Sequence, residues 1–302
     1  RSRALISGKD TATAKLCEQY QLSALYPYNY PFSVPSETKI IAWFPDFQHK
    51  KLPHLFGEKE LQQRDKYLAD IQGKIPHLVL SSKDAAAHYR EYYPDSTIQV
   101  EVLPFVSDIQ AENLPEIVEV KQKYGIEGDY FMVANQFWEH KNHWVVMQAM
   151  KKMVEVNKQV YFIFTGKEED HRNPNYFPDL KTFASENNLT KNISFLGFID
   201  REDQLSLLQH AKAIVQPSKF EGWGTVVEDA KTLNQLVLAS DIPVHHEQLG
   251  TNAYFFGPDD ADRLSELLLG INDQSLNRLH EYRSLEERKL EFAKRFIEIT
   301  LA

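Results

Sequence analysis

The length, composition and charge of the chain exclude several classes of protein. Its 302 residues suffice for two domains of about 150 residues each, and 42% hydrophobic with 25% charged residues is typical of a globular protein. A net charge of −9 without a long basic run argues against a nucleic-acid binder. Cys17 is the only cysteine, which excludes an intrachain disulfide and fits a reducing compartment. No apolar run reaches the ~18 residues of a membrane span and no signal peptide is evident, so we expect a cytoplasmic protein.

The first part of the chain contains few strand signals. Apolar runs rich in Val, Ile and Phe predict buried strands at 39–44, 77–81 and 99–103. Residues 1–36 contain no clear strand, and no glycine-rich turn follows an early strand. A complete doubly wound domain carries more strands, and the chain starts at Arg1 rather than Met. We therefore expect a short and incomplete first domain.

The rest of the chain alternates strand and helix signals. Further apolar runs predict strands at 130–134, 160–165, 193–196, 213–216, 236–239 and 253–256. Amphipathic stretches between them predict helices, for example at 142–156 and 203–211. This alternation predicts parallel βαβ units and hence an α/β fold.

Changes in polarity along the chain predict the domain boundaries. The polar stretch 107–116 is bordered by prolines and predicts a linker after a first domain at 1–106. The second domain is expected at 117–272, followed by C-terminal helices at 273–302. Within the latter, the charged amphipathic stretch 284–299 predicts a helix with a solvated face.

The most specific motif is the Glu-Gly-Trp-Gly loop at 221–224, after the predicted strand 213–216. Its glycines let a ligand approach the backbone, and the N–H groups of a helix starting at Thr225 can bind phosphate. Glu221 can accept hydrogen bonds from hydroxyl groups, and Asp229 lies one helical turn beyond Thr225. Phosphate between hydroxyl groups is the layout of a nucleoside-diphosphate sugar. A glycine-rich turn whose acids stabilise the helix dipole is the alternative, and these residues alone leave it open.

Four motifs in chain order over 130–260 resemble the C-terminal domain of retaining glycosyltransferases of family 4 (glycosyl transferases group 1). They are NQFWEHKNH at 135–143, FLGF at 195–198, PSKFEGWG at 217–224 and ASDIPVHHE at 239–247. The resemblance implies the GT-B fold, in which two Rossmann-like domains with parallel sheets face each other across a cleft. It also implies retaining transfer of a sugar from a nucleoside-diphosphate sugar to a glycan or lipid-linked acceptor, without a metal or other cofactor, in bacterial surface polysaccharide synthesis. Peripheral association with a membrane stays open.

The resemblance further implies a donor site built from these motifs. Glu221 would contact hydroxyl groups of the donor sugar, Lys141 the diphosphate, and Phe198 the nucleotide base. The residues expected to bind the donor are Gln136, His140, Lys141, Phe198, Glu221, Gly222, Trp223, Gly224, Thr225, Glu228 and Asp229.

Two positions depart from the family pattern. Gln136 stands where the family has Arg, so we expect Lys141, His140 and backbone N–H groups to meet the phosphate charge. Asp229 stands at the second glutamate of the paired-glutamate motif and is expected to bind the ribose, with Glu228 as its substitute.

In the first domain, residues 43–53 resemble a strand-end segment of the family more weakly. Asp46 matches an Asp of that segment, Pro45 replaces a His that normally faces the donor sugar, and His49 could supply an imidazole. We therefore expect Asp46 and His49 on the acceptor side of the cleft, as catalytic residues beside Glu221 and Lys141; a solvated loop is the alternative. The Ser-Ser-Lys run at 81–83 also resembles the family's pattern, which implies an acceptor or phosphate contact; a helix cap is the alternative.

Other functions fit the sequence less well. A short first domain also suits a non-catalytic sugar-nucleotide-binding module, or a subunit that requires a partner. A GT-B epimerase fits the EGWG and HKN segments less well than a transferase does. The chain contains no HExxH or CxxC metal motif, no GxSxG elbow and no P-loop, which argues against a zinc enzyme, an α/β-hydrolase and a P-loop enzyme.

Overall fold

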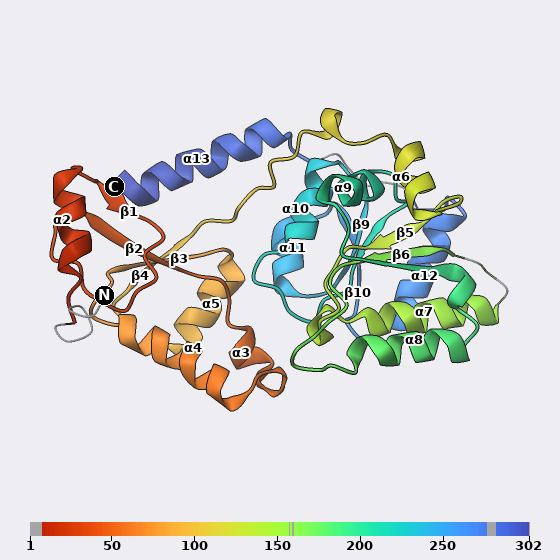
Figure 1. Cartoon of the computed structure of the whole chain (residues 1–302), viewed down its shortest axis with the longest axis horizontal. Helices are drawn as coiled ribbons and strands as arrows, with labels where there is room; N and C mark the ends of the chain where they lie inside the picture. Colours follow the sequence, from red (N-terminus) through yellow and green to blue (C-terminus); the bar gives the residue numbers. More distant parts are fainter. Residues whose placement is uncertain (1–7, 157, 159, 277–281, 302) are drawn as a thin grey trace. The chain divides into compact units, whose positions relative to one another are not determined.

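The computed structural model describes residues 8–156, 158, 160–276 and 282–301 and divides into two compact units (Figure 1). Unit 1 comprises Arg1–Val106 and Glu286–Ala302, and unit 2 comprises Ser107–Leu285. Each unit contains a parallel sheet with helices, so the predicted α/β fold is confirmed. In the part of the chain that the structure describes, no helix combines the length and apolar character needed to cross a bilayer.

Unit 1 contains a four-stranded parallel sheet of order β1-β2-β3-β4. Its strands are β1 (Ala24–Leu25), β2 (Lys39–Phe44), β3 (His77–Leu80) and β4 (Gln99–Val102). The three predicted strands are confirmed. The short β1 was not predicted, because a strand of two residues carries no recognisable apolar run.

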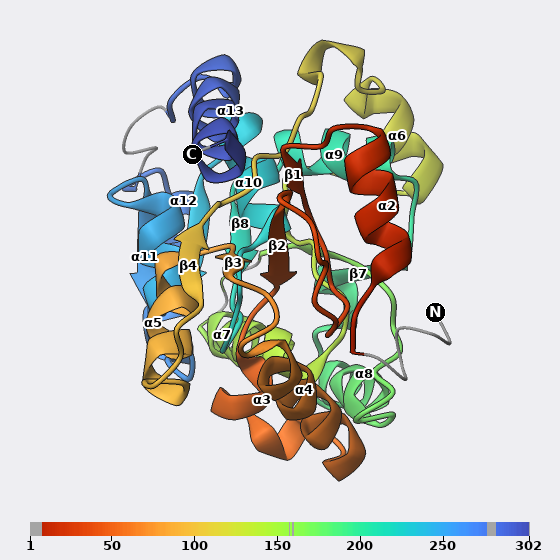
Figure 2. The same cartoon turned by 90° about the vertical axis from the view of Figure 1, so that its left-hand side faces the viewer.

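Both faces of this sheet are covered, which explains the continuous apolar run of β2. The helices of unit 1 are α2 (Thr11–Gln19), α3 (Gln48–Lys51), α4 (Glu58–Ile71), α5 (Lys83–Tyr92) and α13 (Leu285–Leu301), with a 3-10 turn η1 (Pro53–Leu55). Leu68 of α4 and Tyr89 of α5 pack with Ala42 on one face. On the other face, Ile41 packs with Ile299 of α13. Figure 2 shows the ribbon of unit 1 with β2 and α13 labelled. The last helix therefore belongs with the first unit rather than with a separate C-terminal segment.

Unit 2 contains a six-stranded parallel sheet of order β10-β9-β8-β5-β6-β7. Its strands are β5 (Phe131–Val133), β6 (Phe162–Thr165), β7 (Ile193–Gly197), β8 (Ile214–Gln216), β9 (Val237–Ser240) and β10 (Ala253–Phe256). Each lies on a run predicted from the sequence.

Helices cover both faces of the unit 2 sheet. They are α6 (Ile117–Tyr124), α7 (His143–Glu155), α8 (Tyr176–Glu186), α9 (Arg201–Gln209), α10 (Thr225–Thr232), α11 (Pro243–Leu249) and α12 (Ala261–Asn272), with 3-10 turns η2 (Ala111–Asn113), η3 (Glu139–Lys141) and η4 (Thr190–Asn192). The helices α7, α8 and α12 pack on one face, and α6, α9, α10 and α11 on the other (Figure 1). The predicted linker is attached to this unit, because Ile109 is buried in it and Ser107 accepts a hydrogen bond from Thr232.

The strand order of unit 2 creates a topological switch point. From β5 the chain moves to β6 and β7 on one side, and then returns to β8, β9 and β10 on the other. The loops after β5 and β8 therefore leave the sheet in opposite directions at neighbouring strand ends, where open α/β sheets bind ligands.

Candidate functional site

The loops after β5 and β8 are joined by an ion pair at the switch point. Lys141, at the end of η3, donates from Nζ to Oε1 of Glu221 at 2.6 Å. Their side chains are only 17% and 9% exposed. Two residues from separate sequence motifs thus meet in one site, where a charged hydrogen bond is strengthened by poor access to water.

A buried polar network fixes the Glu221 carboxylate. Gln216 Nε2 and Ser218 Oγ donate to the same Oε1 at 2.9 and 2.6 Å. Asn135 Nδ2 in turn donates to Gln216 Oε1 at 3.0 Å. The second oxygen, Glu221 Oε2, has no hydrogen-bond partner among the described residues and can accept one from a ligand.

Neither Gln216 nor Asn135 was predicted as a site residue. The available signal was a polar side chain at the end of an apolar strand run, which is costly unless the side chain is hydrogen-bonded. Asn142 was not predicted as a site residue either. It has a φ of 56° and donates from Nδ2 to the carbonyl groups of Pro217 and Pro258 at 3.1 and 2.6 Å. Asn142 thereby holds the loop after β5 against the loop after β8.

The pKa values of Glu221 and the neighbouring His140 are both lowered in the site. Burial raises the pKa of Glu221, but the adjacent Lys141 charge and the hydrogen bonds outweigh it and lower the pKa to about 2. Burial, reinforced by the Lys141 charge, lowers the pKa of His140 to about 3. Near neutral pH the carboxylate is charged and the imidazole neutral. A neutral imidazole can donate a hydrogen bond to phosphate. The expectation that His140 helps to balance phosphate charge stays a prediction.

The glycine-rich loop offers fewer free backbone donors than its sequence suggests. Gly224 precedes α10, and its N–H donates to Gln248 Oε1 at 3.0 Å, while Gln248 Nε2 donates back to the Gly224 carbonyl at 3.1 Å. The N–H groups of Gly222 and Thr225 make no hydrogen bond within the described residues. The anion-binding backbone consequently excludes Gly224. Trp223 faces Lys231, whose Nζ lies 5.8 Å from the ring centroid.

The two acids of α10 are buried and differ in their partners. Asp229 Oδ1 accepts from Arg201 at 2.6 Å and from Ser107 at 2.5 Å, whereas its buried Oδ2 has no partner among the described residues. Glu228 Oε1 accepts from Lys231 at 2.7 Å and is also within 3.2 Å of Gln248 Nε2. Asp229 thus keeps a buried carboxylate oxygen without a partner in the described structure, as its expected contact with a ribose requires.

A hollow of about 780 Å³ lies at the carboxyl ends of β5, β6 and β7 and is lined by the segments that follow these strands. Gln136, Trp138 and Phe198 contribute to its lining. Phe198 is 86% exposed, an unusual state for a large apolar ring. Two residues expected to bind the donor, Gln136 and Phe198, therefore line one cavity.

The unit 1 residues fit their expected roles less well. His49 is 1% exposed, and its Nε2 lies 3.1 Å from Asp65 Oδ1. Burial lowers its pKa despite the nearby carboxylate. A buried, internally bonded imidazole does not suit a contact with an acceptor, so this assignment is corrected. Asp46 is partly exposed and accepts from the Gln48 N–H at 2.9 Å.

The Ser-Ser-Lys run at 81–83 is structural. Ser82 Oγ accepts from the Ala85 N–H at 3.0 Å and caps α5, and Trp43 Nε1 donates to Ser81 Oγ at 3.3 Å. The structure therefore decides in favour of the helix cap.

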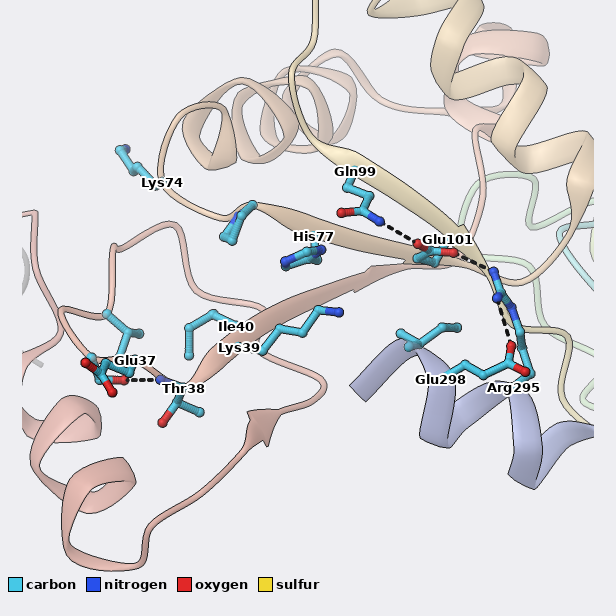
Figure 3. Close-up of a pocket in the computed structure, with 14 residues that line it drawn as sticks. Glu37, Thr38, Lys39, Ile40, Lys74, His77, Gln99, Glu101, Arg295 and Glu298 are labelled. Atoms are coloured by element: carbon cyan, nitrogen blue, oxygen red, sulfur yellow. Dashed lines mark hydrogen bonds and ion pairs between the residues drawn. The ribbon is translucent and has the colours of Figure 1, made fainter. Parts of the chain in front are cut away.

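A second hollow, of about 770 Å³, lies at the amino ends of the unit 1 strands (Figure 3). Arg295 of α13 bridges Glu101 of β4 and Glu298 there, with N–O distances of 2.5 and 3.2 Å. Its charged groups hold α13 on the sheet, and ligands of open α/β sheets bind at the opposite, carboxyl ends. We therefore place the candidate site in unit 2. No group of three or more His, Cys, Asp or Glu side chains that could hold a metal occurs among the described residues.

Two Rossmann-like units with parallel sheets, one carrying this site at its switch point, define a protein of the GT-B class. The family model of glycosyl transferases group 1 matches residues 116–286, more than half of the chain. The chain belongs to this family.

Known proteins agree with this assignment. The O-antigen chain mannosyltransferase RfbU of Salmonella typhimurium is 26% identical over 172 residues, 56% of this chain and 45% of that protein. The chain thus matches less than half the length of this relative. A glycosyltransferase from Rickettsia africae has the same fold, with a TM-score of 0.66, 14% identity, and coverage of 96% of this chain and 77% of that one. Anabaena HepE, solved with UDP and glucose, has a TM-score of 0.64 and 15% identity, covering 87% of this chain and 67% of that one.

Proposed function

We propose that this protein transfers a sugar from a nucleoside-diphosphate sugar to an acceptor hydroxyl, with retention, during synthesis of a bacterial surface polysaccharide of the O-antigen type. The observation that carries the proposal is the Lys141–Glu221 pair at the switch point of unit 2. Membership of glycosyl transferases group 1 supports the reaction type, and the name of the Salmonella relative supports the kind of product.

The charges of the site suit departure of a diphosphate. The bond between the anomeric carbon and the diphosphate oxygen breaks while the acceptor oxygen bonds to that carbon on the same face, and the acceptor hydroxyl gives its proton to the departing diphosphate oxygen. Negative charge builds on the diphosphate, so donors already in position supply most of the catalysis. Lys141 donates one of its three N–H groups to Glu221, and the other two can bind phosphate. The N–H groups of Gly222 and Thr225 add neutral donors.

The remaining groups orient the donor. Glu221 Oε2 accepts from hydroxyl groups of the sugar, because Oε1 is already occupied. The base lies in the 780 Å³ hollow against Phe198. Asp229 Oδ2 accepts from a ribose hydroxyl once the Arg201 side chain, which is about half exposed, moves aside. The acceptor is a glycan or a lipid-linked glycan, and Asp46 stays the proposed residue of unit 1 on its side.

A thermal-shift panel of UDP-, GDP- and ADP-sugars tests the proposal. A ligand at 100 times its Kd stabilises a fold by about 2.7 kcal/mol, which is readily measured. We expect one nucleotide class to raise the melting temperature, and its release from the sugar to depend on an acceptor glycan. Binding without release, with every acceptor offered, would instead support a non-catalytic module or a subunit that needs a partner. No shift with any member of the panel would contradict both.

A further inference from the structure

We infer that Glu168 reads the base of the donor and selects guanine, an inference that rests on the proposed function. Glu168 follows β6 and lines the 780 Å³ hollow together with Phe198. Its Oε1 lies 3.6 Å from the point where a Cβ on Gly197 would stand, so the carboxylate lies against the Gly197–Phe198 turn. Gly197 has a φ of +67°, a backbone conformation in which a side chain would be strained.

The Glu168 carboxylate is unoccupied, whereas its acidic neighbours are committed. Glu169 pairs with Lys167 at 2.9 Å. Asp170 is buried and accepts from the backbone N–H groups of Glu139 and Arg172 at 3.0 and 2.9 Å. Glu168 makes no hydrogen bond or ion pair within the described residues. It is thus the carboxylate of this loop that is ready to bind a ligand in the hollow.

The chemistry of a carboxylate favours one base. An ionised carboxylate only accepts hydrogen bonds, and it binds best to two parallel N–H donors. The Watson–Crick edge of guanine offers that pair in N1–H and the 2-amino group. Uracil offers one N–H between two carbonyl groups, which the carboxylate repels. Adenine and cytosine place a ring-nitrogen acceptor beside their amino group. Guanine alone satisfies both oxygens of Glu168.

The exposed ring of Phe198 completes the pocket without adding selectivity. Every base has a π-face, so stacking on an aromatic side chain tolerates any base. Discrimination must then come from the polar edge. A site built to hydrogen-bond a donor group rejects analogues that lack the group, because the site's own polar atom is left unpaired.

Isothermal titration with GDP, IDP, UDP and ADP tests the inference in the full chain. IDP differs from GDP only by the missing 2-amino group. Loss of one hydrogen bond to a charged acceptor costs about 10-fold in affinity at an exposed site, so we expect GDP to bind about 10-fold more tightly than IDP. UDP and ADP should bind more weakly than GDP by at least that factor. In Glu168→Gln, one acceptor oxygen becomes an amide donor, and the preference for GDP over IDP should disappear.

Glu169→Gln is the matched control. It removes the same charge from the adjacent position of the same loop, but from a side chain that faces Lys167, so the GDP preference should remain. Equal affinity of the unmodified protein for UDP or ADP and for GDP would overturn the inference and leave the proposed function intact. A GDP preference that persists in Glu168→Gln would also overturn it. Failure of all four diphosphates to bind would contradict the proposed function itself.

Discussion

Replacing Lys141 by Met should destabilise unit 2 strongly. The substitution keeps the length of the side chain but removes the charge that faces Glu221 at 2.6 Å. Glu221 is left as a buried carboxylate, hydrogen-bonded only by the neutral groups of Gln216 and Ser218. An unpaired buried charge is costly, whereas replacing both partners by neutral groups is not.

Two arguments give the size of the loss in the free energy of unfolding. Breaking a buried ion pair by removing one partner costs about 3–5 kcal/mol. The fall in the Glu221 pKa from 4.5 to about 2 corresponds to about 3 kcal/mol in favour of the folded carboxylate. The residual exposure of Lys141 and the two neutral donors place the expected loss at the lower end, about 3 kcal/mol.

The pH dependence has a definite sign. Because folding lowers the pKa of Glu221, its stabilising contribution is complete above about pH 4.5 and is lost as the pH falls towards 2. In Lys141→Met, burial no longer competes with a positive charge and raises the Glu221 pKa instead. Protonation of Glu221 then removes the unpaired buried charge of the variant at a higher pH than in the unmodified protein. The difference in stability between the two proteins should therefore be largest near neutral pH and shrink in acid.

Urea unfolding followed by tryptophan fluorescence measures this loss, since Trp138, Trp144 and Trp223 all lie in unit 2. Lys219→Met is the matched control: Lys219 pairs with Asp259 at 2.8 Å, but the two side chains are 41% and 83% exposed. Such an exposed pair contributes below about 1 kcal/mol. Equal losses in the two Lys variants would refute the reasoning, as would a Lys141→Met/Glu221→Gln double variant no more stable than Lys141→Met.

Four further outcomes are expected. Glu221→Ala should abolish sugar transfer while free nucleoside diphosphate still binds; unchanged turnover would exclude the role of Glu221 at the sugar. Gly166→Ala should destabilise unit 2 by on the order of 3 kcal/mol in urea unfolding, because a Cβ would lie 2.3 Å from the Asn135 carbonyl oxygen at a φ of +135°. Asp229→Asn should weaken a ribonucleoside diphosphate by about 10-fold but not its 2′,3′-dideoxy form, and equal losses would remove the ribose from its role. Transfer activity should survive EDTA; loss on chelation and recovery with magnesium or manganese would show that the site needs a metal.

The sequence by itself determined the longer strands and the place of the glycine-rich loop at 221–224. The inner strands of the unit 2 sheet are buried on both faces, so each appears as an apolar run such as Phe131–Val133, which can be recognised without knowledge of its neighbours. The EGWG loop was equally local, because glycines after a strand and before a helix mark a close backbone approach. Local patterns also misled: His49 follows a strand end in the sequence, yet its side chain is buried.

Only the tertiary structure decided which loops share a site. A run of apolar residues reports that a strand is buried but not which strand lies beside it, because strand order depends on packing between distant segments. The order β8-β5-β6 brings Lys141 to Glu221, and the packing of α9 beside α10 brings Arg201 to Asp229. The same packing pairs Glu228 Oε1 with Lys231 and Gln248, which the sequence alone does not show. The burial of these side chains and the partners of their charged groups depend on contacts between distant segments. They could therefore not be predicted from any one segment.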